Sequence, residues 1–202
     1  MSNTLSNPIF TVNSPCQRTS IAPYCQRLKV MVKPHRFDHC IRVSILAESI
    51  ARANNFSASD IRATSLAGIL HDAARDVSAR DMFELAPPKT ELEQQHYLTL
   101  HGRAGRTLAK RWGVNDQRVL DAIEGHVFGV SPSNRIGMAV YIADVSEPAR
   151  GVNEDIRELA MRNLFRAYQY ALDSKVRYLR SKGKVVHPTT LRVYEEICQP
   201  VL

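Results

Sequence analysis

Five polar side chains interrupt apolar helical stretches of this sequence, and a sixth stands at an expected helix start. They are His39, His71, Asp72, His126 and Asp144, with His101 at the helix start. A charged group that is buried without a partner costs several kcal/mol or shifts its pKa. Neutral imidazole and ionised carboxylate together are ligands that iron, manganese or zinc accepts, and helical bundles draw such ligands from several helices. The sequence therefore predicts a metal ion enclosed by a helical core.

The adjacent pair His71 and Asp72 belongs to the segment GILHDAARD, which we expect to be helical. Neighbouring residues point about 100° apart on a helix, so His71 can bind one metal ion while Asp72 reaches over to it or bridges to a second. Asp144 follows the apolar run 140–143 and would destabilise the core without a cation. A single histidine on an apolar face is more often a hydrogen-bonded core residue, so it is the joint occurrence of these residues that favours a metal.

The elements that must position these residues are expected to be helices. Apolar residues recur every three or four positions, as in Ile41, Ile45 and Ile50, and strand signals are scarce. Prolines, Ser-x-x-Asp capping boxes and glycines mark the expected helix ends. The expected helices cover about residues 23–32, 35–54, 57–75, 78–86, 101–112, 115–129, 134–145, 153–182 and 189–198. We therefore predict an all-α fold, a helical bundle with a metal site in its core.

Length and composition fit one domain. The chain has 202 residues, 44% of them hydrophobic, which is enough for a sizeable core. The first residues are rich in Ser, Asn, Thr and Pro, so we expect a flexible arm over residues 1–22 and a single domain over residues 23–202. A signal peptide and an apolar run of about 18 residues are both missing, and the cysteines are far apart with no CxxC pair. We therefore expect a cytoplasmic protein without a disulfide framework or a membrane partner.

The charge of the chain favours anionic partners. The formal net charge is +7 and the pI is about 9.4, which suits nucleic acid, anionic lipid or a polyphosphate small molecule. Lysines and arginines are scattered, without the run of like charge that marks a nucleic-acid tail. Charge alone does not choose among these partners, and a solvated basic surface is the more common reason for such a charge.

The order of the candidate ligands resembles a known signature. His39, then the pair His71 and Asp72, then Asp144 resemble the H…HD…D pattern of the HD-domain phosphohydrolases, an all-helical superfamily. The resemblance narrows to the YqeK-type HD proteins, which are symmetrical bis(5'-nucleosyl)-tetraphosphatases, and it covers about residues 34–197. It is carried by the ordered segments RFDHCIRVSILAESIA, LAGILHDAARD, HGRAGRTLA, VLDAIEGHVFG, YIADVSEPARG, DIRELAMRNL and HPTTLRVY.

This resemblance implies a metal-dependent hydrolase that cleaves diadenosine tetraphosphate into two ADP. It implies an iron ion held by the residues that match His39, His71, Asp72 and Asp144. Manganese or another divalent metal is possible instead, and so is a second metal ion. Asp72 and His71 would be the catalytic pair, with Asp72 and the metal activating water. The resemblance also implies that the nucleotide is contacted by Arg36, Arg75, His101, His126, Arg150 and the segment that begins at His187. His101 and His126 could complete a second metal site instead, but we favour phosphate contact.

Two departures and two rival functions stay open. The family more often has a lysine where Arg75 stands and a threonine after the histidine of the HVFG motif, whereas Val127 and Phe128 offer no hydroxyl. The first rival is another HD-type nucleotidase, acting on a nucleoside monophosphate or a deoxynucleoside triphosphate. The second is a degenerate HD fold that binds nucleic acid or a protein partner, although the intact ligand set argues against it. The oligomeric state, a homodimer included, is not determined by the sequence.

Overall fold

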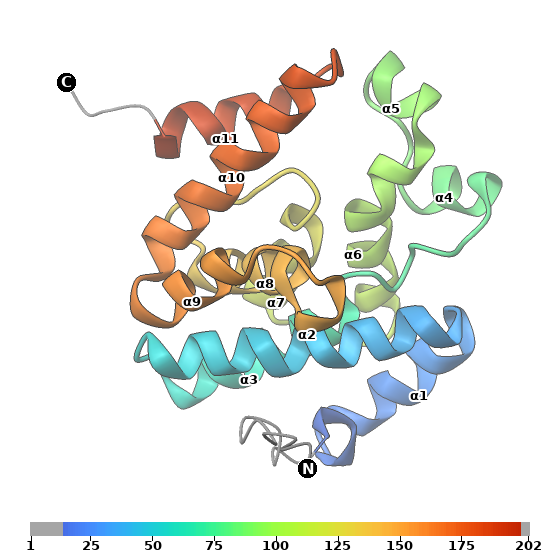
Figure 1. Cartoon of the computed structure of the whole chain (residues 1–202). Helices are drawn as coiled ribbons and strands as arrows, with labels where there is room; N and C mark the ends of the chain where they lie inside the picture. The colour runs from blue at the N-terminus through green and yellow to red at the C-terminus, as the bar shows by residue number, and fades with distance from the viewer. Residues whose placement is uncertain (1–13, 199–202) are drawn as a thin grey trace, which may run out of the picture.

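The computed structural model describes residues 14–198, and all regular secondary structure within this range is helical (Figure 1). Three short 3-10 helices, η2 (Pro15–Gln17), η3 (Tyr97–Leu100) and η4 (Pro148–Arg150), join the longer helices. The α-helices are α1 (Ala22–Met31), α2 (Pro34–Ala53), α3 (Ala58–Leu70), α4 (Ala79–Leu85), α5 (Glu91–Gln95), α6 (His101–Arg111), α7 (Gln117–Gly125), α8 (Arg135–Ser146), α9 (Glu154–Arg162), α10 (Leu164–Ser181) and α11 (Pro188–Cys198). The predicted all-α fold is confirmed.

Local sequence signals account for many of the helix ends. Pro34 occupies the first position of α2, where its missing N–H costs nothing. Ser57 caps α3 by accepting a hydrogen bond from the Asp60 backbone N–H, and its hydroxyl donates to the Asp60 carboxylate. Ser78 repeats this arrangement at the start of α4. The predicted capping boxes are therefore present.

Four sequence-based expectations differ from the structure. The helix expected over residues 115–129 ends at Gly125, so that His126 follows it. The helix expected over residues 153–182 is two helices, because Asn163 adopts an extended conformation and its side chain caps α10. The connector before residue 101 contains α5 and η3. The helix expected over residues 57–75 ends at Leu70, and His71 to Asp76 form a series of turns. The Gly68 carbonyl that would continue the helix accepts a hydrogen bond from the His71 side chain instead.

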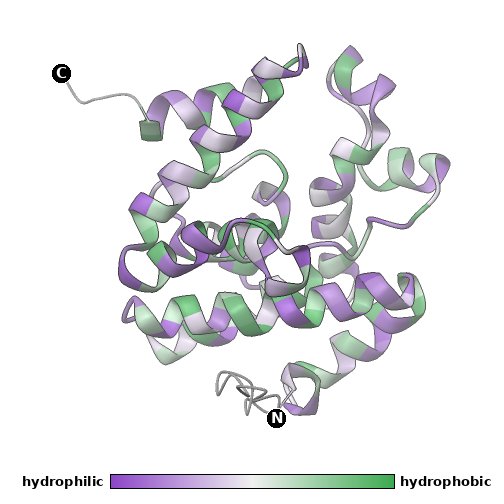
Figure 2. Cartoon of the chain, in the orientation of Figure 1, coloured by the Kyte–Doolittle hydropathy of each residue, from purple (hydrophilic) through white to green (hydrophobic). Residues whose placement is uncertain are grey.

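Helix α8 is the centre of the bundle. It packs against α2, α3, α7, α9 and α10, and residues 136–143 are buried without interruption. A helix that is apolar on all sides must be enclosed by other elements. The outer helices instead alternate hydrophilic and hydrophobic residues (Figure 2). The aspartate at 144, near the end of α8, is thereby carried into the interior.

The segment before α2 is tied to the bundle. Pro15 and Ile21 are buried, and the Arg18 guanidinium donates to Glu48 of α2 at 2.6 and 3.0 Å. Residues 14–22, expected to belong to a flexible arm, are thus packed as far as the structure describes them, and residues 1–13 of that arm lie outside the described residues.

A disulfide joins Cys16 and Cys25, which the sequence did not predict. The turn between η2 and α1 brings the two Cα atoms to 5.7 Å, and this proximity depends on backbone hydrogen bonds that no cysteine-spacing pattern reports. Cys40 and Cys198 are free. None of the helices between residues 14 and 198 combines the length and apolar character that a bilayer crossing requires.

Close packing of α2 on α3 generates the first testable prediction. A Cβ atom added at Gly68 would meet the Cα atom of Ser44 at 2.7 Å, and backbone cannot move aside cheaply. We expect Gly68→Ala to lower the free energy of unfolding by about 1–3 kcal/mol, measured by urea denaturation. Gly105→Ala is the matched control, because its Cβ would meet the Ile123 Cγ2 atom at 3.2 Å and no backbone atom closer than 3.4 Å, and alanine favours the helix. Equal stability of Gly68→Ala and the unmodified protein would contradict this account.

Candidate metal centre

The ends of five helices bring the candidate ligands together. His39 lies in the second turn of α2, His101 begins α6, and His126 directly follows α7. The sequence predicts that His71 and Asp72 lie within a helix. In the structure they directly follow α3, and both lie in a turn. These five side chains are buried, and the Asp144 side chain retains 19% exposure. Because His71 and Asp72 lie in a turn after the helix end, these two consecutive side chains can both point into one site, which neighbouring residues within a helix cannot do.

One group of ligand atoms comes from His39, His71 and Asp144. Their nearest ligand atoms all lie within 4.8 Å of one another. The Asp144 Oδ1 atom is 3.0 Å from His39 Nε2 and 3.7 Å from His71 Nε2. Two imidazoles and one carboxylate at this spacing could hold a metal ion.

A second group shares the His71 ring. His71, Asp72 and His126 also have ligand atoms within 4.8 Å of one another. Asp72 Oδ1 lies 3.2 Å from His101 Nε2 and 3.6 Å from His126 Nε2. His71 is therefore common to both groups, which form one continuous cluster of six side chains. His101 and His126 contact Asp72 directly.

Backbone carbonyls fix the tautomers of three histidines. The Nδ1 atoms of His71, His101 and His126 lie 2.8, 2.6 and 2.7 Å from the carbonyl oxygens of the residues three positions earlier. A carbonyl oxygen only accepts, so each Nδ1 carries the proton and each neutral ring turns the lone pair of Nε2 to the centre. This is the arrangement of metal-binding histidines, whose outer N–H is held by a carbonyl or carboxylate.

Two features of the cluster fit the binding of a cation. The buried Nε2 atom of His71 has no hydrogen-bond partner among residues 14–198, which is costly for a polar atom. The Nε2 atoms of His101 and His126 are 2.9 Å apart, so the lone pairs of the two neutral rings face each other. A positive ion between these atoms would satisfy both. The residues present therefore fit a metal ion.

The electrostatics of the site favour the ionisation states that metal ligands need. Burial raises the pKa of Asp72 and of Asp144, but the nearby histidines outweigh it and hold both pKa values well below the ordinary range. Burial lowers the pKa of His126 to about 4. Burial also lowers the pKa of His71, but Asp72 and Asp144 outweigh it and raise the net value. The centre thus attracts positive charge, and a metal ion competes with a proton for His71.

Glu147 and Arg42 support His39 from outside the cluster. The buried Glu147 carboxylate lies 3.1 Å from His39 Nδ1 and accepts hydrogen bonds from Arg42 at 2.8 and 3.2 Å. A carboxylate on the outer nitrogen orients the ring and makes Nε2 a better ligand. Sequence reasoning missed Arg42, although its position three residues after His39 places it on the same helical face.

The arginines expected to bind phosphate differ in their contacts. Arg36 Nη1 lies 2.8 Å from Asp72 Oδ2, and Arg150 Nη2 lies 2.5 Å from Asp144 Oδ1. Both guanidinium groups thus reach the cluster through its carboxylates. The Arg75 side chain forms no hydrogen bond or ion pair with any residue in the described range 14–198, although Arg75 lies in the same turn as Asp72.

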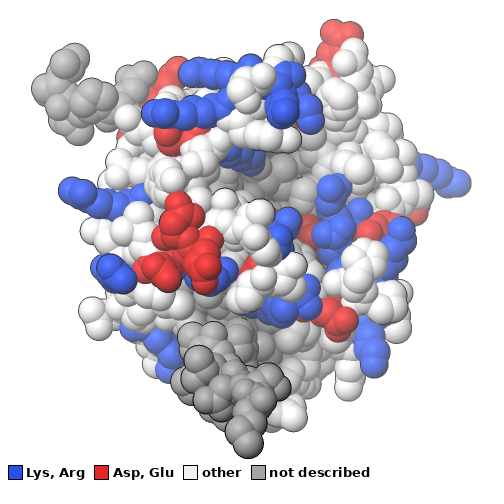
Figure 3. Space-filling model, viewed as in Figure 1, with Lys and Arg blue, Asp and Glu red and all other residues white. Residues whose placement is uncertain are grey.

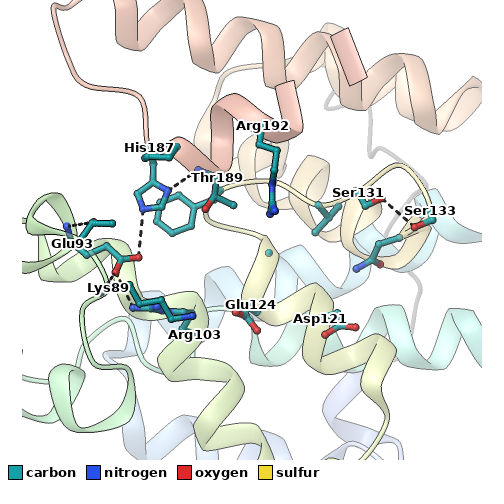
Figure 4. A pocket seen from close by; sticks show the side chains of 17 residues that line it. Lys89, Glu93, Arg103, Asp121, Glu124, Ser131, Ser133, His187, Thr189 and Arg192 are labelled. Carbon is teal, nitrogen blue, oxygen red and sulfur yellow. Dashed lines mark hydrogen bonds and ion pairs between the residues drawn. The ribbon is translucent and has the colours of Figure 1, made fainter. Parts of the chain in front are cut away.

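His187 is not part of the cluster. Its ring stacks on Phe128 with centroids 3.8 Å apart, and its Nε2 atom lies 3.4 Å from the buried Glu93 carboxylate. Figure 4 shows His187 at the edge of a cavity of about 590 Å³ that is also lined by Asp121 and Glu124. The six cluster residues do not line this cavity. Since Phe128 follows His126 by two positions, His187 reaches the cluster only through the segment after α7.

The comparison with protein families agrees with this cluster. The HD domain matches residues 36–149, which contain all six residues of the cluster. The chain belongs to the HD-domain family. The resemblance to HD-domain proteins that the sequence predicts is therefore confirmed.

Individual relatives narrow the comparison. The HD-domain chain is 30% identical over 175 residues to a Bacillus subtilis protein named "Bis(5'-nucleosyl)-tetraphosphatase, symmetrical", covering 83% of this chain and 91% of that protein. A solved structure from Clostridium acetobutylicum, described as a "predicted HD superfamily hydrolase involved in NAD metabolism", has a TM-score of 0.78 and 26% identity over 86% of this chain and 94% of that chain.

A longer relative comes from Mycoplasma genitalium. It is named "Probable nicotinate-nucleotide adenylyltransferase/Ap4A hydrolase" and is 32% identical over 155 residues, which are 72% of this chain. The HD-domain chain spans 43% of the length of that relative and 46% of its Mycoplasma pneumoniae counterpart.

The cluster predicts that metal binding depends on Asp144. Asp144→Asn keeps the size of the side chain and removes its charge, so we expect the purified variant to retain less than about a tenth of the metal bound by the unmodified protein. Elemental analysis by mass spectrometry measures this directly. Asp121→Asn is the control, because Asp121 pairs with Arg106 away from the cluster. An Asp144→Asn variant with full metal content would exclude this assignment of the ligands.

Proposed function

We propose that this HD-domain protein is a metal-dependent hydrolase that cleaves diadenosine tetraphosphate symmetrically into two ADP. The observation that carries the proposal is the shared His71 ring, which joins two ligand groups and has an unpartnered Nε2 atom aimed into them. The named activity of the Bacillus subtilis relative, matched over most of both chains, supports this substrate. The net charge of +7 also suits a polyphosphate.

We assign His39, His71, Asp72 and Asp144 as the metal ligands. Imidazole-rich sites suit iron, the metal that the resemblance implies, and manganese or another divalent metal is the alternative. When bound, the metal lowers the pKa of a bound water molecule and neutralises phosphate charge. Glu147 keeps the His39 ring oriented through Nδ1.

His101 and His126 are better placed for a cation than for a phosphate. Their Nδ1 protons are held by backbone carbonyls, so the Nε2 atoms of the neutral rings carry lone pairs and cannot donate to phosphate oxygens. The low pKa of His126 keeps that ring neutral. We therefore infer that His101, His126 and Asp72 would hold a second metal ion, in place of the phosphate contacts that we favour from the sequence.

The remaining roles follow from charge and reach. Asp72, the one carboxylate in contact with both the Arg36 guanidinium and the His101 ring, orients the attacking water and receives its proton. Arg36 and Arg150 provide forked donors that can pass from the carboxylates to phosphate oxygens as negative charge develops there. The Arg75 side chain, free of ion pairs in the range that the structure describes, is available to a phosphate from the start.

The product pattern tests the proposed function. With Fe(II) or Mn(II) supplied, we expect diadenosine tetraphosphate to yield ADP as the only nucleotide product, resolved by chromatography. Asp72→Asn should lower kcat about a hundredfold or more, because it removes the proton acceptor and a ligand charge. Asp76→Asn is the matched control: Asp76 lies in the same series of turns, and its carboxylate accepts from the Lys33 backbone N–H at 2.9 Å.

Three results would contradict the proposal. Formation of ATP and AMP would exclude symmetrical cleavage. Turnover of nucleoside monophosphates or deoxynucleoside triphosphates in preference to the dinucleotide would favour the rival HD-type nucleotidase. An Asp72→Asn variant with unchanged metal content, stability and turnover would favour the binding-module alternative.

A further inference from the structure

A second cavity, of about 460 Å³, is lined by Val127 and Phe128, the two residues that follow His126 of the metal centre. One side of the cavity is formed by α10 and the residues that follow it. The other side is formed by α5 and η3. Its walls combine apolar side chains with basic ones. The lining includes Val127, Leu179, Thr99, Lys175 and Lys184.

The charge of this cavity differs from that of the larger one. Among the described residues its lining includes two lysines and two histidines but no carboxylate. The cavity of Figure 4 is lined instead by Glu93, Asp121 and Glu124 together with its basic residues. An anionic ligand near the metal centre is therefore favoured on the lysine side. Figure 3 shows lysine and arginine side chains around a hollow in this face, between α10 and α6.

Lys175 connects the cavity to the metal centre. Its Nζ atom donates to the carbonyl oxygen of Val127, the residue after His126, and lies 5.3 Å from the centre of the Tyr141 ring. The Asp144 charge acts on the ammonium group and favours its charged form. On the opposite wall, Thr99 lies in η3, whose Leu98 carbonyl holds the His101 ring.

The Lys175 ammonium group lacks an anionic partner. It forms no ion pair within residues 14–198, and burial lowers its pKa to about 8. A half-buried cation without a counter-ion is unfavourable. One of its three N–H donors is used by Val127, so two remain for a ligand. A phosphate group would supply both the charge and the acceptors.

We propose that Lys175 is a phosphate-binding residue and that the cavity around it takes one nucleoside oligophosphate half of the substrate. The phosphates would lie against Lys175 and Lys184, and the nucleoside against Leu179 and the other apolar side chains. The volume is within the range of small-molecule sites, and an apolar wall with few polar groups is their usual composition. This inference rests on the proposed function for the identity of the substrate, but not for the anion site itself.

Binding of ADP and of adenosine to the full-length protein tests the proposal. By isothermal titration calorimetry, Lys175→Met should weaken ADP binding about tenfold or more, the loss expected for a charge-assisted hydrogen bond, while adenosine binding stays unchanged. Lys175→Arg should restore ADP affinity to within about threefold of the unmodified protein. Lys182→Met is the matched control, because Lys182 follows α10 directly but does not line the cavity.

A second variant covers the case in which Lys175→Met fails to fold. Leu179→Trp fills the cavity from a half-buried position and leaves the lysine in place, so it should weaken ADP binding at least about fivefold. Unchanged ADP affinity in either folded variant, with melting temperature measured alongside, would overturn the subsite. If ADP binding depends on Lys175 but diadenosine tetraphosphate is not hydrolysed, the anion site stands and the proposed function falls.

Discussion

Two carboxylates in a buried cluster of imidazoles are the constraint on which the rest of this structure depends. Asp72 and Asp144 are held ionised in the interior, and each is surrounded by ring nitrogens at 3.0 to 3.8 Å. Such a cluster is unfavourable by itself, because several lone pairs and two negative charges converge where water is excluded. A bound metal ion would make the same arrangement favourable. The residues that would perform the chemistry would then also stabilise the folded protein.

The helices contribute to this centre through their ends. Carbonyl groups near the C-termini of α3 and α7 and in η3 lack partners in a continuing helix. They accept instead from the Nδ1 atoms of His71, His126 and His101. The same hydrogen bonds end the helices and orient the rings, so the fold and the ligand geometry have one origin. The buried α8 then places Asp144 opposite these rings.

Positive charge is layered around the centre. Arg36 and Arg150 contact the ligand carboxylates directly, and Lys175 lies one step further out on the carbonyl of Val127. A highly negative polyphosphate entering this site would meet cations at each step without displacing structural ion pairs on the outer surface. The larger neighbouring cavity has the carboxylates of Glu93, Asp121 and Glu124 beside its basic residues. The two cavities next to the segment after α7 therefore differ in charge, because only the smaller one is lined by basic residues without carboxylates.

The sequence by itself determined the helical fold, the capped starts of α3 and α4 and the residue types of the centre, because helical periodicity and capping depend on neighbours within four positions. Only the tertiary structure decided that α3 ends before His71, that Arg42 and Glu147 support His39, and that Cys16 meets Cys25. It also decided the place of Lys175, which approaches Val127 across 48 positions of the chain. These features depend on contacts between distant segments, such as the 105 positions between His39 and Asp144. Local residue preferences do not fix such distances, because they arise from the packing of whole helices around α8.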